Sequence, residues 1–177
     1  MKKILIVTDM LVDFISEIGT LYIGPTGTAI IAPIAERIRK YLLNGDIVIF
    51  LCDAHKEDSP EFLRFPKHCV KGTEGAKVIP ALANLVSDNM IVIPKTTYDG
   101  TFGTNLGNIL KQYDVGAPEM CEICGCCTSI CCLFTAASIV NMGFPLMLHR
   151  DCVADFDQEA HAFALGHMEK ILGVKVI

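Results

Sequence analysis

The sequence predicts a single α/β domain over residues 1–177, built on a six-stranded, mainly parallel, doubly wound sheet with helices on both faces. Short apolar segments alternate along the chain with segments of helical periodicity, an order typical of parallel sheets. The apolar segments are nearly continuous, as expected for strands that are buried on both faces. Neither a repeat nor a linker divides the chain, and 177 residues suffice for one substantial core but not for two.

In the first half of the chain we expect, in order, a strand, a helix, a strand and a short helix, at residues 4–8, 28–43, 46–52 and 78–86. The first strand is a short apolar run. The first helix places Ile30, Ile34 and Ile38 on one side, and Gly45 ends it. The second strand is again apolar, and a long polar connection over residues 53–77 follows it.

The second half is expected to alternate in the same way, beginning and ending with a strand, through residues 90–94, 104–113, 119–126, 129–142, 145–149, 158–172 and 174–177. Strands that alternate with helices pair in parallel and bring helices to both faces of the sheet. In open parallel sheets, ligands bind beyond the carboxyl ends of the strands, near the point where the strand order reverses.

Composition and charge narrow the possible classes of function. Hydrophobic residues make up 51% of the chain and charged residues 20%, which excludes a disordered protein. The net charge of -5, with no cluster of Lys and Arg, argues against nucleic acid as a partner. The apolar start of the chain ends at Asp9 and is too short for a signal peptide. Polar residues break the stretch 133–148, so no membrane span is expected and we predict a cytoplasmic protein.

Nine cysteines, an odd number without a secretion signal, indicate free thiols in a reducing compartment. Cys121 and Cys124 imitate a metal or redox motif, but they fall in a predicted strand, where positions three apart point to opposite faces. They should therefore share neither a metal ion nor a disulfide. Most of the cysteines are interpreted as small buried apolar side chains.

Reactive side chains follow the predicted strands at their carboxyl ends. Asp9 follows the first strand, Asp53 and His55 the second, and Lys95 the third. The fourth strand runs into a polar segment that contains Cys131. Because the carboxyl ends of parallel strands lie at one edge of the sheet, we expect an acid, a lysine and a cysteine to meet there.

The segment around Cys131 suits a nucleophile. Thr128 is a suitable N-cap for the following helix, which places Cys131 in the first turn. There the helix dipole is expected to stabilise a thiolate, and the exposed amide groups can form an oxyanion hole. Lys95 would add a positive charge, while Asp9 could accept the thiol proton and later protonate a leaving amine.

Several motifs resemble those of the isochorismatase-like cysteine hydrolases, in order and over nearly the whole chain. The longest is Gly-x-x-Thr-x-x-Cys-x-x-x-Thr-Ala at residues 125–136, in which Ser129 stands where this family usually has Asp. The shorter motifs are Asp9 with Asp13-Phe14, and Lys95 with Tyr98 and Phe102.

This resemblance implies an isochorismatase-like, Rossmann-like three-layer fold and a catalytic triad of Asp9, Lys95 and Cys131. It also implies a cis peptide bond between Cys126 and Cys127. In the family pattern, the amides of Cys127 and Cys131 would form the oxyanion hole.

A second polar group lies in the long connection after the second strand. Asp53, His55, Glu61 and His68 could hold zinc, iron or manganese in a mixed nitrogen and oxygen shell, although their spacing alone is a weak signal. The segment 65–76 is similar to the nicotinamidase stretch in which the histidine before Cys-Val is a metal ligand. The resemblance therefore implies one divalent metal ion, zinc or alternatively iron or manganese. Glu61 falls where many members have a histidine and some a glutamate.

Aromatic residues suit a flat substrate ring. Phe14 and Phe65 match positions that sandwich a pyridine in nicotinamidases, where the metal is thought to hold the ring nitrogen. Phe102 is a further candidate wall of the substrate site. Phe65 replaces a more usual Trp, and Leu11 replaces a usual Gln. The remaining polar residues near the end of the chain are interpreted as structural, or as a loop cap in the case of the aspartate: His149, Asp151, His161 and His167.

The leading hypothesis is an amidohydrolase that converts nicotinamide to nicotinate and ammonia through a thioester at Cys131. Another amide or carbamoyl substrate of the same family is the first alternative, and a non-enzymatic thiol or metal sensor is the second. Isochorismatase chemistry is disfavoured because it needs neither the nucleophilic cysteine nor a metal shell. The expected partner is a small-molecule amide, with neither nucleic acid nor membrane, and the family suggests a homo-oligomer.

Overall fold

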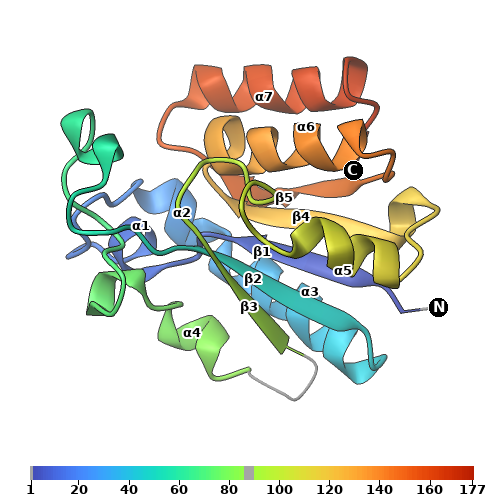
Figure 1. Ribbon diagram of the computed structural model, residues 1–177, viewed down its shortest axis with the longest axis horizontal. Helices are drawn as coiled ribbons and strands as arrows, with labels where there is room; N and C mark the ends of the chain where they lie inside the picture. Colours follow the sequence, from blue (N-terminus) through green and yellow to red (C-terminus); the bar gives the residue numbers. More distant parts are fainter. Residues whose placement is uncertain (1, 86–89) are drawn as a thin grey trace.

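The computed structural model describes residues 2–85 and 90–177 and consists of a twisted sheet with helices against both faces (Figure 1). Neighbouring strands of the six-stranded sheet are all parallel in this part of the chain, so the predicted doubly wound fold is confirmed and the sheet is wholly parallel. The strands are β1 (Ile4–Thr8), β2 (Ile47–Asp53), β3 (Met90–Lys95), β4 (Cys121–Cys126), β5 (Met147–Ala154) and β6 (Lys175–Val176).

Helices fill most of the connections between these strands. The α-helices of the described residues are α1 (Val12–Ile15), α2 (Pro25–Ala29), α3 (Ile31–Leu43), α4 (Pro80–Ala83), α5 (Leu106–Gln112), α6 (Leu133–Asn141) and α7 (Gln158–Lys170). Short 3-10 helices occur at η1 (Pro60–Leu63), η2 (Glu74–Ala76) and η3 (Pro118–Met120), and a π turn at η4 (Thr128–Cys132).

The strand order β3-β2-β1-β4-β5-β6 reverses between β1 and β4. Such a reversal is the point where open parallel sheets bind ligands. At the carboxyl end of this pair, Thr8 lies opposite Gly125. Gly125 has a φ of 110°, and a Cβ atom added there would lie 1.9 Å from the Thr8 carbonyl oxygen. Only glycine therefore allows the two strands to approach so closely beside the expected site.

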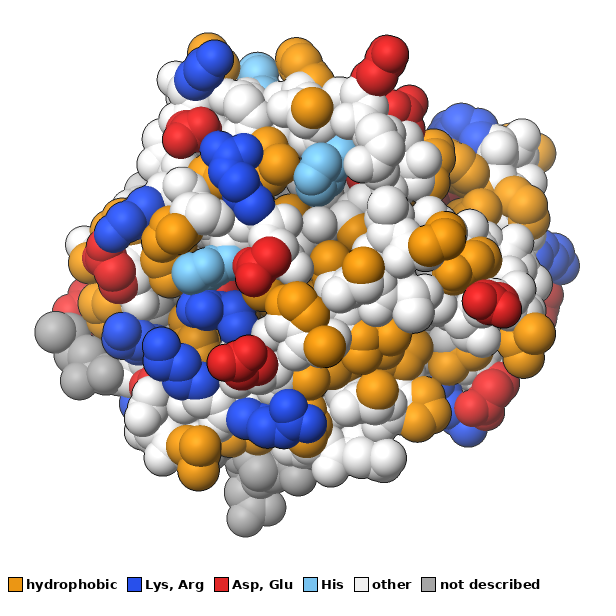
Figure 2. All heavy atoms as spheres, turned by 180° about the vertical axis from the view of Figure 1, so that it is seen from behind, with side chains coloured by type: hydrophobic (Ala, Val, Ile, Leu, Met, Phe, Trp, Pro, Cys, Tyr) orange, Lys and Arg blue, Asp and Glu red, His pale blue; other side chains and the backbone are white. Residues whose placement is uncertain are grey.

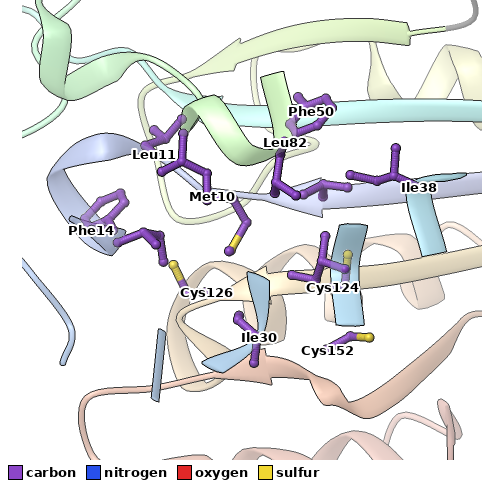
Figure 3. Close-up of a cluster of buried hydrophobic side chains, with 14 of the residues drawn as sticks. Met10, Leu11, Phe14, Ile30, Ile38, Phe50, Leu82, Cys124, Cys126 and Cys152 are labelled. Carbon is purple, nitrogen blue, oxygen red and sulfur yellow. The ribbon is translucent and has the colours of Figure 1, made fainter. Parts of the chain in front are cut away.

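Each face of the sheet carries its own buried core. On one face α3 and α4 pack through Ile38 and Leu82, close to Phe50 of β2 (Figure 3). On the other face α5 and α7 pack through residues such as Leu110 and Met168. Because both faces are covered, the strands are apolar along nearly their whole length, which explains the continuous apolar runs in the sequence.

All nine cysteines are buried and free. Cys124 lies in the core that contains the α3 side chains (Figure 3), whereas Cys121 lies in the core on the opposite face. The prediction that these two thiols point to opposite sides of the sheet is therefore confirmed.

The predicted helix at 28–43 is divided into α2 and α3, and the short helix at 78–86 is a single turn that begins at Pro80. Residue 86 lies outside the described residues. The fifth strand continues to Ala154 instead of ending at 149, so the prediction of a loop cap at Asp151 is wrong. The register with β4 shifts between Ile123 and Gly125, and the charged stretch 149–151 belongs to this irregular part of the strand. A pattern based on hydrophobicity cannot distinguish such a stretch from a loop.

None of the described helices is long and apolar enough to cross a bilayer. On the face seen in Figure 2, acidic and basic side chains lie interspersed with hydrophobic ones.

Candidate active site

Three side chains meet at the carboxyl edge of the sheet, near the point where the strand order reverses. Asp9 directly follows β1, Lys95 ends β3, and Cys131 lies in the π turn η4 after β4. The Lys95 Nζ atom lies 2.7 Å from Asp9 Oδ2 and 3.4 Å from Cys131 Sγ. The structure thus brings together the acid, the lysine and the cysteine that the strand ends predict.

A second carboxylate contacts the same lysine. Asp53 Oδ1 lies 2.5 Å from Lys95 Nζ, and the Asp53 amide donates a hydrogen bond of 2.8 Å to Asp9 Oδ1. Burial lowers the pKa of Lys95, but the charges of Asp53 and Asp9 outweigh it and raise this pKa well above its ordinary value. Burial is the largest single influence on the pKa of Asp53 and raises it, yet the interactions with Lys95 and His55 together hold this pKa below its usual range. Lys95 and Asp53 are therefore an ion pair.

Burial sets the resting state of the thiol. It raises the pKa of Cys131 well above the ordinary value, and the Lys95 charge opposes this shift without offsetting it. Desolvation thus exceeds the stabilisation of a thiolate that a helix start and one lysine provide. Cys131 is a neutral thiol at neutral pH and requires a nearby proton acceptor before it can act as a nucleophile.

Asp9 is placed to be that acceptor. Burial, and after it the charge of Asp53, raises the pKa of Asp9 to about 6 despite the presence of Lys95. At neutral pH the carboxylate is ionised, yet it is a stronger base than an ordinary aspartate. Asp9 adopts a left-handed φ of 52°, which is uncommon for a residue other than glycine. Its carbonyl oxygen is held by the Leu11 amide at 2.8 Å and the Cys126 thiol at 3.2 Å.

The segment that carries Cys131 begins with a π turn instead of an α-helical turn. The carbonyl oxygen of Cys127 accepts hydrogen bonds of 3.1 Å from the amides of Ile130 and Cys132, and so passes over the Cys131 amide between them. The peptide bond between Cys126 and Cys127 is cis, as the family resemblance implies. Single π turns inside helices are frequent at functional sites.

Thr128 does not cap this segment, so the N-cap prediction is wrong. The Cys127 carbonyl starts the turn, which places Thr128 inside it, and its side chain makes no capping hydrogen bond. The Ser129 amide donates a hydrogen bond to Asp155 Oδ2 at 2.7 Å. The Thr128 hydroxyl lies 2.9 Å from His161 Nδ1.

The four residues predicted as metal ligands gather beside the lysine and the thiol. One ligand atom from each of Asp53, His55 and His68 lies within 4.8 Å of the others. The two oxygens of Glu61 lie 3.8 Å from His55 Nε2 and 3.6 Å from His68 Nε2. Among the described residues, the buried His55 Nε2 atom finds no hydrogen-bond partner, an arrangement that is costly unless a further group binds there. Two imidazoles and two carboxylates fit a divalent metal ion such as zinc.

Outer contacts orient this cluster. His68 Nδ1 donates a 2.7 Å hydrogen bond to the Pro66 carbonyl oxygen, which leaves Nε2 free for a ligand role. The His55 amide donates to the carbonyl oxygen of Cys69 at 2.9 Å, so the two histidine segments lie side by side. Asp13 Oδ2 in turn accepts the Cys69 amide at 2.7 Å, which ties the loop to α1.

A cavity of about 240 Å³ lies between the cysteine and the metal-ligand cluster. Phe14 and Phe65 line it, as predicted for walls of a ring site. Phe102 does not line it, and this residue is 70% exposed. Leu11 lies outside the cavity, fully buried and bridged to Val78.

Several lining residues escape the sequence analysis: Leu21, Tyr22, Ile23, Ile130 and Phe156. The segment before α2 and the loop after β5 contribute most of them. Their positions depend on how loops fold over the strand ends, a feature without periodicity. Only Ile130, the neighbour of Cys131, could have been found from its place in the motif.

The fold and the strand-end site define a class of protein. The family model described as "Isochorismatase domain" matches residues 3–177, so this chain belongs to the isochorismatase family of hydrolases. The isochorismatase family protein PncA of Bacillus subtilis (strain 168) is 36% identical, with 99% of each chain covered.

Solved structures give the same family with more detail. The nicotinamidase PncA from Bacillus subtilis superposes with a TM-score of 0.92, at 35% identity and with 99% of each chain covered. A pyrazinamidase of Pyrococcus horikoshii in complex with zinc superposes with a TM-score of 0.89 at 32% identity, covering 100% of this chain and 99% of the other.

Proposed function

We propose that this chain is a cysteine amidohydrolase that converts a heteroaromatic carboxamide, nicotinamide, to its carboxylic acid and ammonia. The observation that carries the proposal is the shared cavity, in which Cys131 and Asp9 face a cluster of metal-ligating side chains between two phenylalanine rings. Similarity to a nicotinamidase and to a pyrazinamidase supports the same activity.

In the proposed reaction, the Cys131 thiol gives its proton to the Asp9 carboxylate while the sulfur attacks the carboxamide carbon. The C–N bond of the tetrahedral intermediate then breaks, and Asp9 returns the proton to the leaving nitrogen as ammonia departs. A thioester remains. Water attacks this thioester with Asp9 as base, the C–S bond breaks, and the proton held by Asp9 restores the thiol as the acid leaves.

Two further groups stabilise negative charge in this scheme. The Lys95 ammonium, 3.4 Å from Cys131 Sγ, stabilises the negative charge that develops on sulfur. The amides of Cys127 and Cys131 are assigned to the oxyanion hole. In support, the Cys127 amide finds no acceptor within the described part of the chain, and the π turn leaves the Cys131 amide out of the bonds to the Cys127 carbonyl.

Asp53, His55, His68 and Glu61 would hold a divalent cation, for which zinc in the Pyrococcus horikoshii pyrazinamidase structure is the precedent. Such a cation supplies a Lewis acid that can bind a ring nitrogen and so orient the carboxamide toward Cys131. Phe14 and Phe65 would then contact the faces of the ring. A cavity of about 240 Å³ lies below the usual range of ligand pockets, roughly 300–1,000 Å³, and favours a substrate with a single ring.

Ammonia release from a panel of carboxamides tests this function. We expect nicotinamide and pyrazinamide to be hydrolysed, whereas benzamide, which lacks the ring nitrogen, should be slower by roughly two orders of magnitude in kcat/KM. Equal rates for nicotinamide and benzamide would show that no group in the site binds the ring nitrogen. Release from an aliphatic carbamoyl compound alone would assign the chain to another amidase specificity. No release from any amide would contradict the proposal and favour a sensor.

A further inference from the structure

The turn that carries Cys131 is held from outside by two side chains that follow β5. Asp155 Oδ2 accepts the Ser129 amide at 2.7 Å, and His161 Nδ1 lies 2.9 Å from Thr128 Oγ1. Asp155 and Thr128 are fully buried, and His161 is partly buried. Neither Asp155 nor His161 lines the cavity, so these contacts act on the turn and not on a bound molecule.

Both contacts provide hydrogen-bond partners for polar groups that find none within the π turn itself. The Cys127 carbonyl accepts the amides of Ile130 and Cys132, and the Ser129 amide has no part in these bonds. The Thr128 hydroxyl is buried with the rest of its side chain. A buried donor without a partner costs about 1–3 kcal/mol. Asp155 and His161 therefore stabilise this turn by giving two of its polar groups hydrogen-bond partners.

The two supporting residues are themselves fixed. The Asp155 carbonyl oxygen accepts the Thr26 hydroxyl at 2.9 Å, which joins it to α2. Asp157 caps α7 by accepting the amides of Glu159 and Ala160 at 2.9 and 3.0 Å. The His161 amide donates to the Asp157 carbonyl oxygen at 2.9 Å, which places the imidazole in the first turns of α7. The support for the nucleophile thus comes from an anchored helix start.

We propose that Asp155 and His161 are positioning residues, which keep the Cys131 thiol near Lys95 and keep the Cys127 and Cys131 amides directed into the cavity. The expected effect on reaction rate rests on the proposed function. The expected effect on the conformation of the π turn does not. A displacement of about 1 Å in a reacting group can cost on the order of a hundredfold in rate. Loss of either contact should therefore slow the chemical step and leave substrate binding nearly intact.

Substitutions at His161 test this role. His161→Leu keeps the volume but removes the contact with Thr128, and we expect kcat to fall by about 10- to 100-fold with KM changed less than about threefold. His161→Asn places an amide group near the position of Nδ1 and should recover most of the rate. His167→Leu is the matched control, because His167 lies on the same helix and stacks on Phe163, and within the described residues its side chain makes no hydrogen bond to the turn. It should leave kcat unchanged.

Thr128→Val removes the other partner of the same contact. If the two groups act through one hydrogen bond, Thr128→Val should reduce kcat by a factor similar to that of His161→Leu, and the double variant should lose little more. Additive losses would contradict the proposal, as would a loss in His161→Leu that His161→Asn does not recover.

Amide hydrogen exchange of the segment 126–134, followed by mass spectrometry, requires no substrate. We expect faster exchange there in His161→Leu and wild-type exchange in His161→Asn and His167→Leu. If the wild type releases no ammonia, the proposed function fails. Hydrogen exchange would still test whether His161 stabilises the turn. A folded His161→Leu variant with wild-type exchange would overturn the proposal.

Discussion

Cys131 differs from the other cysteines in its neighbours and not in its burial. Burial raises the pKa of Cys121, Cys124 and Cys132 as it does that of Cys131. In the part of the chain that the structure describes, Cys131 alone has an ammonium group within hydrogen-bonding distance, that of Lys95. The reactivity assigned to it therefore depends on its surroundings, which supply both a positive charge and a proton acceptor.

Cys131→Ala should abolish ammonia release, because among the described residues no other thiol is within hydrogen-bonding distance of Lys95, which is paired with Asp9. Cys132→Ala is the matched control. Its side chain packs into the core on the α6 face, so we expect activity to persist while the free energy of unfolding falls by about 1 kcal/mol. Peptide mapping after treatment with an electrophilic amide locates the adduct. An adduct on Cys126 or Cys127 would refute the assignment.

The pH dependence follows from Asp9. Burial, ahead of the charge of Asp53, raises its pKa to about 6, and the protonated acid cannot accept the Cys131 proton. We therefore expect kcat/KM to rise with pH through about 6 and to level off above it. An acid limb near the ordinary aspartate value, about 4, would show that Asp9 is not the base.

At the scale of elements, the long loop between β2 and η2 depends on a close contact with α1. Asp13 accepts the Cys69 amide, and a Cβ atom added at Gly75 would lie 2.0 Å from Asp13 Oδ2. Cys69 itself has a positive φ of 45° next to His68. The absence of a side chain at Gly75 therefore allows Asp13 to hold the loop in the shape that directs His68 toward the other ligands.

Gly75→Ala should weaken the metal site without touching any ligand. The added methyl group displaces the Asp13 carboxylate, and we expect metal affinity to fall by about 10- to 100-fold, as for loss of other outer-shell contacts. Metal content after dialysis against a weak chelator measures this. Gly166→Ala is the control, since among the described residues no atom beyond the neighbouring backbone of α7 lies within 4 Å of the added Cβ, and alanine favours a helix. Unchanged metal content in Gly75→Ala would rule out the role given to Asp13.

Strand order alone predicts which side chains meet at the strand ends, whereas in the connections only the family resemblance points to site residues, and it does so incompletely. Asp9, Lys95 and Cys131 follow apolar strands, and parallel pairing brings strand ends to one edge whatever the loops do. Phe102 and Phe156 lie in connections whose shape depends on particular hydrogen bonds. The first is exposed although a site role was predicted, and the second lines the cavity although none was. The π turn likewise depends on Asp155 and cannot be predicted from the local pattern.

At the scale of the whole molecule, metal binding should be linked to stability. The four proposed ligands come from one strand end and one loop, and they are brought together only in the folded chain. A cation that binds the folded state alone raises the free energy of unfolding by mass action. We expect chelation to lower Tm by several degrees and added zinc to restore it.

Two variants separate this linkage from catalysis. Cys131→Ala keeps all four ligands and should retain the zinc-dependent shift in Tm while it lacks activity. His68→Ala should lose both the shift and bound metal, as judged by elemental analysis. Full activity of wild-type protein after complete chelation would contradict a metal role in the reaction.

The pairing of β1 with β4 also has a consequence for synthesis on the ribosome. Ile4 pairs with Cys121, so more than a hundred residues must emerge between the two central strands. Until then β1, β2 and β3 can form only half a sheet, with one edge of β1 open. That edge borders the future nucleophile. Pairing across such a separation is slow, and an open apolar edge invites association with other nascent chains. The strand order that places the site between β1 and β4 therefore also leaves the edge of β1 as the part of the nascent chain that a chaperone would need to protect.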